Sequence, residues 1–516
     1  MGTKNNRMRH SWFGPLFRKR LLIILMLLVQ IAFLIFLTAF TSRYFIVLHW
    51  GFVAVSIYVA LCLVMQRFKG AYKFTWVFLI LLFPLFGGLF YLFFTNQSST
   101  RRIKRILKKT YAKTRGLFRL PENTYQGEVP SNFKPQIRYL ESYAGFPAFG
   151  RTKTQYLPTG EDMFEHLIAE LKKAEKYIFL EYFIIQQGKM WNTILNILEE
   201  KAKCGVDVRI IYDDFGCFWI LPKNYCQTLK NKGISCAVFN PFKPLLTTSQ
   251  NNRDHRKIAV IDGKTAFTGG NNLADEYINE IEKFGYWKDT AVKVTGDAAW
   301  SFALIFLQQW SVCTQQQENY EAFYPWNETV CGIADDGIVV PFADSPMDLE
   351  NVYEQVYLQI INNAKEYVYI TTPYLIIDDN MVTALTLAAK SGVDVRILTP
   401  HIWDKRVVHF TTQSYYKTLL DEGVKIYEFT SGFVHAKTIV SDDQVAVVGS
   451  ANLDYRSLYL QFECGVLLLN SSAVSQMRDD FLNMLRSSGE ILPEDCACGR
   501  IKSFVQKVVR LFAPLM

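Results

Sequence analysis

The chain lacks any arrangement of cysteines that would indicate a disulfide scaffold or a zinc site. Its ten cysteines in 516 residues are irregularly spaced, and the one close pair, Cys496 and Cys498, has no second pair to accompany it. Unpaired thiols are typical of proteins in a reducing cytoplasm. Histidine is also scarce, with seven copies, and there is no low-complexity region. These absences argue against a small disulfide-bonded protein and against a metal site built from cysteine and histidine.

Apolar residues, in contrast, are abundant near the start of the chain. Half of all residues are hydrophobic and 15% are aromatic, which is high for a soluble enzyme of this length. Residues 21–40 and 45–65 are uncharged runs of 20 and 21 residues, long enough to cross a bilayer. A third apolar segment, residues 75–94, is interrupted by Pro84 and by two glycines at 87–88. Because no small-residue cleavage site follows the first run, we expect an uncleaved membrane anchor.

The positive charges beside these segments predict how they cross the membrane. Lys and Arg number six in residues 1–20, one in 41–44, three in 66–74 and nine in 95–120. Three full crossings would divide these charges almost equally between the two sides. Two crossings, followed by a segment that dips in and returns, would place nearly all of them on one side. We therefore expect two transmembrane helices, a re-entrant segment at 75–94 and a cytoplasmic catalytic domain.

The most informative motif of the sequence occurs twice. HRKIAVIDGK begins at His255, and its chemical skeleton returns as HAKTIVSDDQ, beginning at His435. Side chains two residues apart on a strand face the same way, so each His and the Lys that follows it are expected to converge on one cavity. In both copies the His is followed by Lys at +2, Asp at +7, Gly at +14 and Asn at +17, which selects Lys257, Asp262, Gly269 and Asn272, and then Lys437, Asp442, Gly449 and Asn452.

These residue types indicate phosphoryl transfer. Two His, two Lys and two Asn supply positive charge and hydrogen-bond donors for a phosphoryl transition state. One neutral His would attack phosphorus while the other, protonated, gives its proton to the leaving alkoxide. We expect no metal and no other cofactor, because each Lys would repel a cation from its His. The expected catalytic set also includes Asp262 and Asp442, which should fix backbone and Lys geometry more than act on substrate. Around the phosphate we expect Asn272, Asn452 and Ser450.

The duplication extends upstream of both motifs. KAEKYIFLEYFII at 173–185 parallels NAKEYVYITTPYLII at 363–377, and GVDVRI occurs at 205–210 and again at 392–397. Each half alternates apolar strands with amphipathic helices, which predicts an α/β fold of two tandem repeats with mixed sheets, forming one catalytic domain with its site on the seam. The expected divisions are a membrane anchor at 1–94, a basic juxtamembrane segment and linker at 95–150, repeats at 151–330 and 331–499, and a basic amphipathic helix at 500–516.

The paired motifs resemble those of the phospholipase D superfamily. The segments NNRDHRKIAVIDGKTAFTGGNNLADEY, YWKDT, TPYLI and FVHAKTIVSDDQVAVVGSANLDYRS are similar to bacterial cardiolipin synthases, and the resemblance runs from about residue 75 to the end of the chain. It implies that His255 is the nucleophile and His435 the general acid and base. It also implies that Glu463 orients an active-site His. The first half has Lys283 at the corresponding offset, so Asp289 in YWKDT is expected to substitute there.

The resemblance further implies a phosphatidyl transfer from one phosphatidylglycerol to another, giving cardiolipin and glycerol through a phosphohistidine intermediate. The expected partners are these two lipids and an anionic membrane surface, in agreement with a net charge of +8. No nucleic-acid partner is expected, the oligomeric state stays open, and the expected location is the bacterial cell membrane, as a multi-pass protein. A phospholipase D-type hydrolase and a transphosphatidylase that uses phosphatidylethanolamine remain alternatives, whereas two complete motifs argue against a non-catalytic lipid-binding scaffold.

Two basic segments each have two interpretations. Residues 101–115, RRIKRILKKTYAKTR, could form a solvated helix, but their position after an apolar segment favours contact with anionic headgroups. Residues 500–516 place apolar and basic side chains on different helical faces. That pattern is compatible with a terminal helix packed on the core and with a helix at a membrane interface.

The predicted topology is tested by thiol labelling at the two ends of the third apolar segment. Single cysteines at Lys73 and Ser98, in an otherwise cysteine-free chain, are both expected to be protected from an impermeant reagent in intact cells, because a re-entrant segment returns to the side on which it began. If the cysteine at 98 reacts while that at 73 does not, the segment crosses the membrane and the catalytic domain lies outside.

Overall fold

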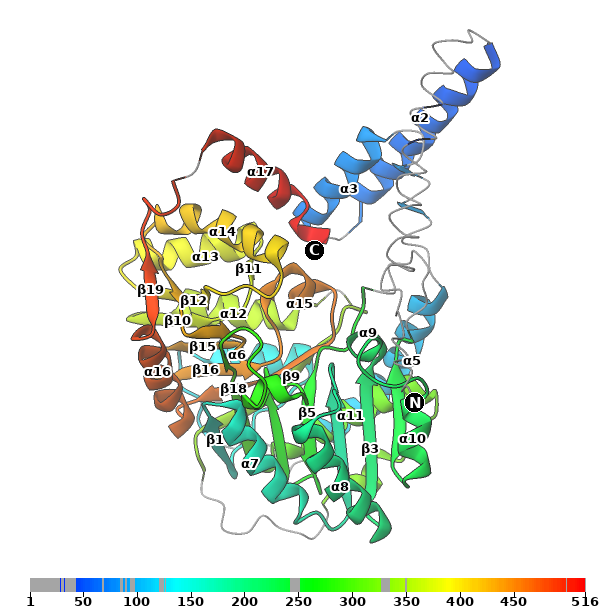
Figure 1. Cartoon of the computed structure of the whole chain (residues 1–516), viewed down its shortest axis with the longest axis vertical. Coiled ribbons are helices and arrows are strands. Elements are labelled where there is room, and N and C mark those ends of the chain that lie inside the picture. The colour runs from blue at the N-terminus through cyan, green and yellow to red at the C-terminus, as the bar shows by residue number, and fades with distance from the viewer. Residues whose placement is uncertain are drawn as a thin grey trace, which may run out of the picture. The chain divides into compact units, whose positions relative to one another are not determined.

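A computed structural model describes residues 28, 32, 43–66, 69–83, 87–88, 91–92, 98–119, 125, 127–241, 251–325, 335–348, 350–497 and 499–515. The chain divides into two compact units (Figure 1). Unit 1 comprises Met1–Ser98 and Lys243–Gln250, and unit 2 comprises Ser99–Phe242 and Asn251–Met516.

Unit 1 contains two helices in mutual contact, α2 (Arg43–Val64) and α3 (Gly70–Leu82). The expected span at 45–65 coincides with α2, whereas the expected span at 21–40 lies outside the described residues except at positions 28 and 32. Helix α3 ends two residues before Pro84, which itself is not among the described residues. Within the described part of the chain, no helix combines the length and the apolar character needed to cross a membrane. The predicted spans and the re-entrant segment stay predictions.

Unit 2 is built on two mixed sheets, as the sequence predicted. In the first repeat β2, β3 and β4, at one end of the sheet, are parallel, and the remaining neighbours are antiparallel. The strand order is β1-β8-β6-β5-β2-β3-β4. The strands are β1 (Thr152–Leu157), β2 (Tyr177–Tyr182), β3 (Asp207–Asp213), β4 (Ser235–Phe239), β5 (Lys257–Ile261), β6 (Thr265–Gly269) and β8 (Ala291–Gly296), with helices α7 (Gly160–Leu171), α8 (Lys189–Lys203) and α10 (Tyr225–Asn231).

The second repeat has the same topology with one further strand at its edge. Its order, β19-β13-β12-β10-β15-β16-β18-β9, reproduces that of the first sheet in reverse direction once β19 is set aside. This match makes β18 the structural counterpart of β8. The elements are β9 (Ile338–Asp344), β10 (Tyr367–Thr371), β12 (Asp394–Pro400), β13 (Lys425–Phe429), β15 (Thr438–Ser441), β16 (Val445–Gly449), β18 (Glu463–Leu469) and β19 (Ser488–Ile491), with helices α12 (Val352–Asn363), α13 (Asp379–Lys390), α14 (Arg406–Leu420) and α16 (Ser472–Leu485).

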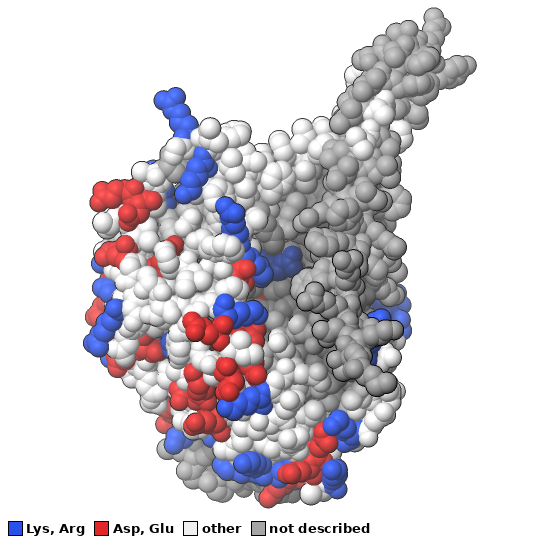
Figure 2. Space-filling model, in the orientation of Figure 1, with Lys and Arg blue, Asp and Glu red and all other residues white. Residues whose placement is uncertain are grey.

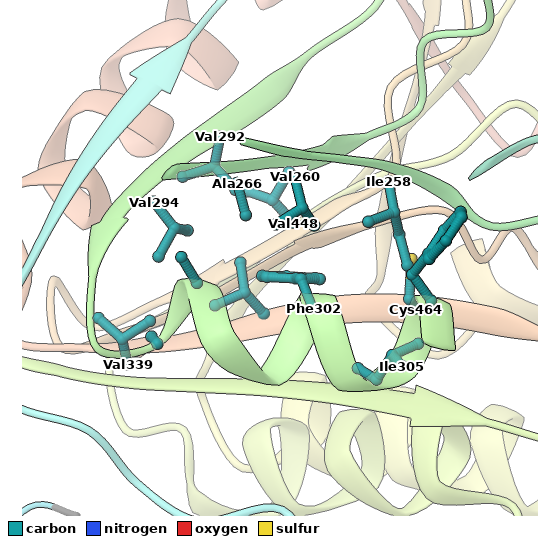
Figure 3. Packing of buried hydrophobic residues seen from close by; sticks show 14 of the residues in the cluster. Ile258, Val260, Ala266, Val292, Val294, Phe302, Ile305, Val339, Val448 and Cys464 are labelled. Carbon is teal, nitrogen blue, oxygen red and sulfur yellow. The ribbon is translucent and has the colours of Figure 1, made fainter. Parts of the chain in front are cut away.

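A shared hydrophobic core joins the two repeats. Figure 3 shows side chains of the first sheet, such as Val260 and Val292, packed together with Val448 and Cys464 of the second sheet beside helix α11 (Ala299–Thr314). Helix α11 is apolar on nearly all sides, and its residues from 299 to 312 are all buried. A helix with this composition is stable only inside a protein. The seam is therefore part of the folding core, and the two repeats form one domain.

Helix α5 (Ser98–Phe118), which from Ser99 onward belongs to unit 2, packs on this core. Leu107 and Phe118 are buried, the Gln308 amide donates a hydrogen bond to Thr114 at 2.7 Å, and Trp300 Nε1 donates to the Leu117 carbonyl at 2.9 Å. The basic side chains of residues 101–115 are exposed on the other face. The apolar face of this helix therefore contacts protein, and only its cationic face remains for headgroups or solvent.

Both motif aspartates form the turn of a hairpin. Asp262 lies between β5 and β6 with φ +54°, and Asp442 lies between β15 and β16 with the same φ. Asp and Asn tolerate this left-handed conformation better than most residues do. The Asp262 carboxylate accepts hydrogen bonds from the backbone N–H groups of residues 175, 176 and 177, each at 2.8 Å, and Asp442 accepts from those of 365, 366 and 367 at 2.8 to 3.0 Å. Each aspartate thus fastens its hairpin to the start of the neighbouring strand.

This geometry predicts a structural role for Asp442. Asp442→Ala removes an ionised acceptor of three backbone hydrogen bonds and should lower the free energy of unfolding by about 2–4 kcal/mol. Asp442→Asn keeps one acceptor oxygen and the left-handed turn, so its loss should be clearly smaller. Chemical denaturation of the two variants measures the difference. Equal stability of the Ala variant and the parent would contradict the role.

Candidate active site

His255 lies just before β5 and is held from the second repeat. Its backbone N–H donates to the Phe462 carbonyl at 2.9 Å. Its ring Nδ1 lies 2.9 and 3.1 Å from the two carboxylate oxygens of Glu463, at the start of β18. Ser450 also donates to this carboxylate. Because a carboxylate accepts the Nδ1 proton, Nε2 is the ring atom left for chemistry.

His435 has the mirror arrangement and is held from the first repeat. Its backbone N–H donates to the Lys288 carbonyl at 2.7 Å, next to a short parallel pairing of β14 (Gly432–Val434) with β7 (Tyr286–Lys288). Its Nδ1 lies 2.6 Å from Oδ2 of Asp289, just before β8. Each histidine is therefore oriented by a carboxylate from the other repeat.

The strand order explains why Asp289, and not Lys283, faces a histidine. Asp289 precedes β8 and Glu463 begins β18, and these two strands occupy equivalent places in their sheets. The first repeat contains the additional strand β7 between its Asn and its carboxylate, which changes the spacing in sequence. Lys283 instead donates to Glu276 at 3.0 Å at the edge of the site. Both expected carboxylate positions thus lie against histidines.

Lys257 and Lys437 lie buried beside the two histidines, each with 1% of its surface exposed. Lys257 Nζ donates to the His255 carbonyl at 2.5 Å, and Lys437 Nζ donates to the His435 carbonyl. Burial lowers the pKa of Lys257 to about 8 and that of Lys437 to about 7. The two ammonium groups therefore titrate near neutral pH, while ordinary lysines stay charged to far higher pH.

The histidines rest in their neutral form. Burial lowers the pKa of His255 to about 4 and that of His435 to about 3, and the neighbouring lysine charges act in the same direction. Burial alone would raise the pKa values of Glu463 and Asp289, but the hydrogen bond from the histidine and the ammonium charge beside each carboxylate hold its pKa below the usual value. Each pair therefore consists of a neutral imidazole and an ionised carboxylate, which is the state a nucleophilic histidine needs.

Both histidines open onto one cavity of about 720 Å³. Asn272 and Asn452 also line it, and the Nδ2 group of each donates a hydrogen bond to a neighbouring side chain. Asn272 accepts from the Ile184 backbone N–H at 3.0 Å and donates to the Tyr277 hydroxyl at 2.7 Å, and Asn452 donates to the Asp454 carboxylate at 3.3 Å. The asparagines therefore shape the loops around the histidines.

Asp262 and Asp442 do not line this cavity. Their expected role of fixing the backbone is confirmed, whereas their expected role of fixing the lysines, and with it their place in the catalytic set, requires correction. Each lies at the far end of the strand that begins beside its histidine. Seven residues of extended chain cover about 20 Å. Their carboxylates bind backbone N–H groups, as described above, and no hydrogen bond or ion pair links either of them to Lys257 or Lys437 in the described part of the chain.

Sequence reasoning did not select the aromatic and arginine side chains of the cavity. Phe183 lies 5.1 Å from the His255 ring, measured between centroids, and Tyr277 and Trp287 each lie 5.5 Å from that of His435. Arg253 and Arg456 also line the cavity. Trp287 and Arg253 stand within two residues of Asp289 and His255, so proximity to the motifs was the only signal available.

In the described residues no group of three or more His, Cys, Asp or Glu could hold a metal ion.

Comparison with known proteins agrees with this geometry. A family profile described as "Cardiolipin synthase, PLD-like domain" matches residues 167–285 and 357–485. The chain is 44% identical to an uncharacterized protein of Streptococcus mutans over 86% of the chain and 96% of that protein. It is 35% identical to a cardiolipin synthase of Alkalihalophilus pseudofirmus over 86% of the chain and 88% of that protein. The chain shares its fold, over 72% of its length, with 95% of phosphatidylserine synthase of Haemophilus influenzae, at a TM-score of 0.54 and 15% identity.

The lowered lysine pKa values predict the alkaline limb of activity. The value of kcat/KM for a phosphodiester substrate should fall as pH rises through about 7 to 8, because the free protein then loses the charges of Lys437 and Lys257. Lys437→Arg carries a charge that does not titrate in this range, so the limb should move to higher pH even if turnover is lower. Lys283→Arg, at the edge of the cavity, is the matched control and should leave the limb in place. An unchanged limb in Lys437→Arg would contradict the assignment.

Proposed function

The chain belongs to the cardiolipin synthase family of phospholipase D-like proteins, and on this premise we propose that it transfers a phosphatidyl group from one phosphatidylglycerol to another, forming cardiolipin and releasing glycerol. The observation that carries the proposal is the pair of crosswise contacts, His255 with Glu463 and His435 with Asp289, at one cavity. Two equivalent imidazoles facing the same space suit a reaction with two successive displacements at phosphorus.

In the first half of the reaction, Nε2 of His255 attacks the phosphorus of one phosphatidylglycerol. The N–P bond forms and the bond from phosphorus to the headgroup glycerol oxygen breaks. His435, protonated, gives its Nε2 proton to that oxygen, and free glycerol leaves. Glu463 stabilises the positive charge that develops on His255, because its ionised carboxylate remains hydrogen-bonded to Nδ1.

In the second half, a hydroxyl of the headgroup glycerol of another phosphatidylglycerol attacks the phosphohistidine. His435 is now neutral and accepts the hydroxyl proton, while the N–P bond breaks and His255 is restored. One phosphodiester is exchanged for another, so the lipid and glycerol concentrations set the direction. The proton returns to His435, and both imidazoles are ready for the next cycle.

Binding of the negatively charged substrate favours protonation of His435, which then serves as the general acid. In the empty site burial and lysine charge keep the pKa of this histidine at about 3. A phosphodiester brings a negative charge between the lysines and the histidines, which favours the protonated imidazole. Asp289 supports the same change from the Nδ1 side. A general acid is thus formed when an anionic substrate is bound.

The N-terminal segments are proposed to hold this chemistry at the bacterial cell membrane. We assign two transmembrane helices at 21–40 and 45–65, a re-entrant segment at 75–94 and a catalytic domain on the cytoplasmic side, on the basis of apolar length and flanking charge. Both substrates are bilayer lipids, so an anchored enzyme meets them at high local concentration.

The proposed function predicts the behaviour of the two histidine variants. His255→Ala and His435→Ala should each lower cardiolipin formation by about a thousandfold or more, and the double variant should be little worse, since the residues act as a unit. Purified chain in vesicles is supplied with phosphatidylglycerol that carries one label on phosphorus and another on the headgroup glycerol, and cardiolipin and free glycerol are quantified. In His435→Asn, rapid denaturation should leave phosphatidyl label on His255.

Three outcomes distinguish this function from its alternatives. Phosphatidic acid in place of cardiolipin would identify a hydrolase. Dependence of the product on added phosphatidylethanolamine would identify that lipid as the donor. Label on His435 in the His255→Asn variant, with none on His255 in His435→Asn, would exchange the two roles.

A further inference from the structure

Two equivalent loops, one from each repeat, border the mouth of the active-site cavity. The first follows β3 and contains the short helix α9 (Asp214–Cys217), and the second runs from the end of β12 through the first residues of α14, to Val407. Strands β3 and β12 hold equivalent places in their two sheets, so each loop leaves the carboxyl-terminal end of the corresponding strand. Phe215 and Gly216 of the first loop line the cavity, as do Lys405 and Val407 of the second.

Both loops expose large apolar side chains next to this mouth. In the first loop Phe218, Trp219 and Ile220 are 40%, 55% and 36% exposed. In the second loop Trp403 and Val407 are 47% and 59% exposed. Exposed apolar clusters of this kind mark surfaces that bind an apolar partner. Trp is favoured at the boundary between an apolar and an aqueous environment.

The C-terminal segment of the chain also borders the mouth of the cavity. Helix α17 (Arg500–Leu511) buries none of its residues, and Ile501 and Phe504 are 83% and 66% exposed. It is fixed to α14 by Arg510, whose guanidinium carbon lies 4.2 Å from the Tyr415 ring centroid. The next segment, η5 (Ala513–Leu515), contacts the helix α15 (Tyr455–Tyr459), and Ala513 lines the cavity. We call Phe218, Trp219, Ile220, Trp403, Val407, Ile501 and Phe504 together the docking rim.

Basic side chains accompany the docking rim. Lys223 follows the first loop, Lys405 and Arg406 lie in the second, and α17 carries Lys502 and Lys507, all of them exposed. Figure 2 shows Lys and Arg side chains projecting from the end of the unit that carries α17 in Figure 1. Apolar side chains mixed with exposed Lys and Arg are complementary to an anionic bilayer surface, where the first enter the headgroup layer and the second meet lipid phosphates.

We propose that the docking rim inserts into the headgroup layer of an anionic bilayer, so that the cavity mouth opens directly onto the lipid surface. This inference rests on the proposed function for the identity of the substrate lipids. The docking rim defines where the substrate lipids enter the site. Their acyl chains stay among the apolar side chains of the rim, while the phosphate headgroup reaches the histidines. Equivalent loops on both repeats give two approach routes, one for each of the two lipids in the reaction.

The first test locates the rim relative to the bilayer without using activity. An environment-sensitive fluorescent amino acid replaces Trp219 or Phe504 in the full chain, which is reconstituted in vesicles of phosphatidylcholine and phosphatidylglycerol. Cys204 is the matched control, because it is exposed and precedes β3, about 20 Å along the strand from the first loop. Lipids with a shallow spin label should quench the probes at 219 and 504 and leave the probe at 204 unquenched.

Quenching at 219 and 504 no stronger than at 204 would overturn the proposal, whether or not the vesicles form cardiolipin. Quenching at the rim in vesicles that form no cardiolipin would leave the docking surface intact and refute the proposed function. If the probe at 219 shifts its emission with protein concentration in detergent and is not quenched in vesicles, the rim is an interface between copies of the chain, and the proposal fails.

The second test uses a variant that leaves the cavity lining unchanged. Trp219→Ser, Trp403→Ser and Phe504→Ser are combined, since none of the three residues lines the cavity. Turnover of phosphatidylglycerol in vesicles should fall at least about tenfold, because less apolar surface enters the bilayer. Turnover of a short-chain, monomerically dissolved phosphatidylglycerol should stay within about twofold of the parent. Equal activity of variant and parent on vesicles would contradict the proposal, as would an equal loss on both substrates.

Discussion

The structure of the catalytic unit depends on two hydrogen bonds between its repeats, from His255 to Glu463 and from His435 to Asp289. Each bond places a charged carboxylate in a fully buried position, which is unfavourable unless the charge is met by a specific partner. That partner is a histidine of the other repeat. The site can therefore exist only when both sheets have docked, and the apolar contacts around α11 supply the driving force for docking.

The same burial sets the protonation states on which the chemistry depends. Removing the imidazoles from water favours their neutral form, and the two lysines beneath them oppose protonation further. The lysines are themselves destabilised as cations and hold their charge only to about neutral pH. Binding of an anionic phosphodiester favours both the protonated histidines and the charged lysines. Affinity for the phosphate and creation of the acid thus have one electrostatic cause.

Pseudo-symmetry between the repeats is strict in the strand order and relaxed in the loops. Turn aspartates, buried lysines and histidine-orienting carboxylates have counterparts in both halves. The first repeat inserts β7 before its carboxylate, and the second repeat adds β19 and the C-terminal helix. The two loops at the cavity mouth differ in sequence but share exposed aromatic side chains. A duplicated fold can in this way keep one reaction centre while each half presents its own surface to a lipid.

From the sequence alone, the paired motifs, the upstream repeats and their α/β alternation could be predicted, because they depend on local periodicity. The two-residue spacing of extended chain predicts that the side chains of His255 and Lys257 point to the same side. The docking of the sheets decided the rest. It paired His435 with Asp289 despite the unequal spacing. It also gathered the arginine, aromatic and C-terminal residues around the cavity, since contacts between segments distant in sequence follow from strand order, which no local pattern encodes.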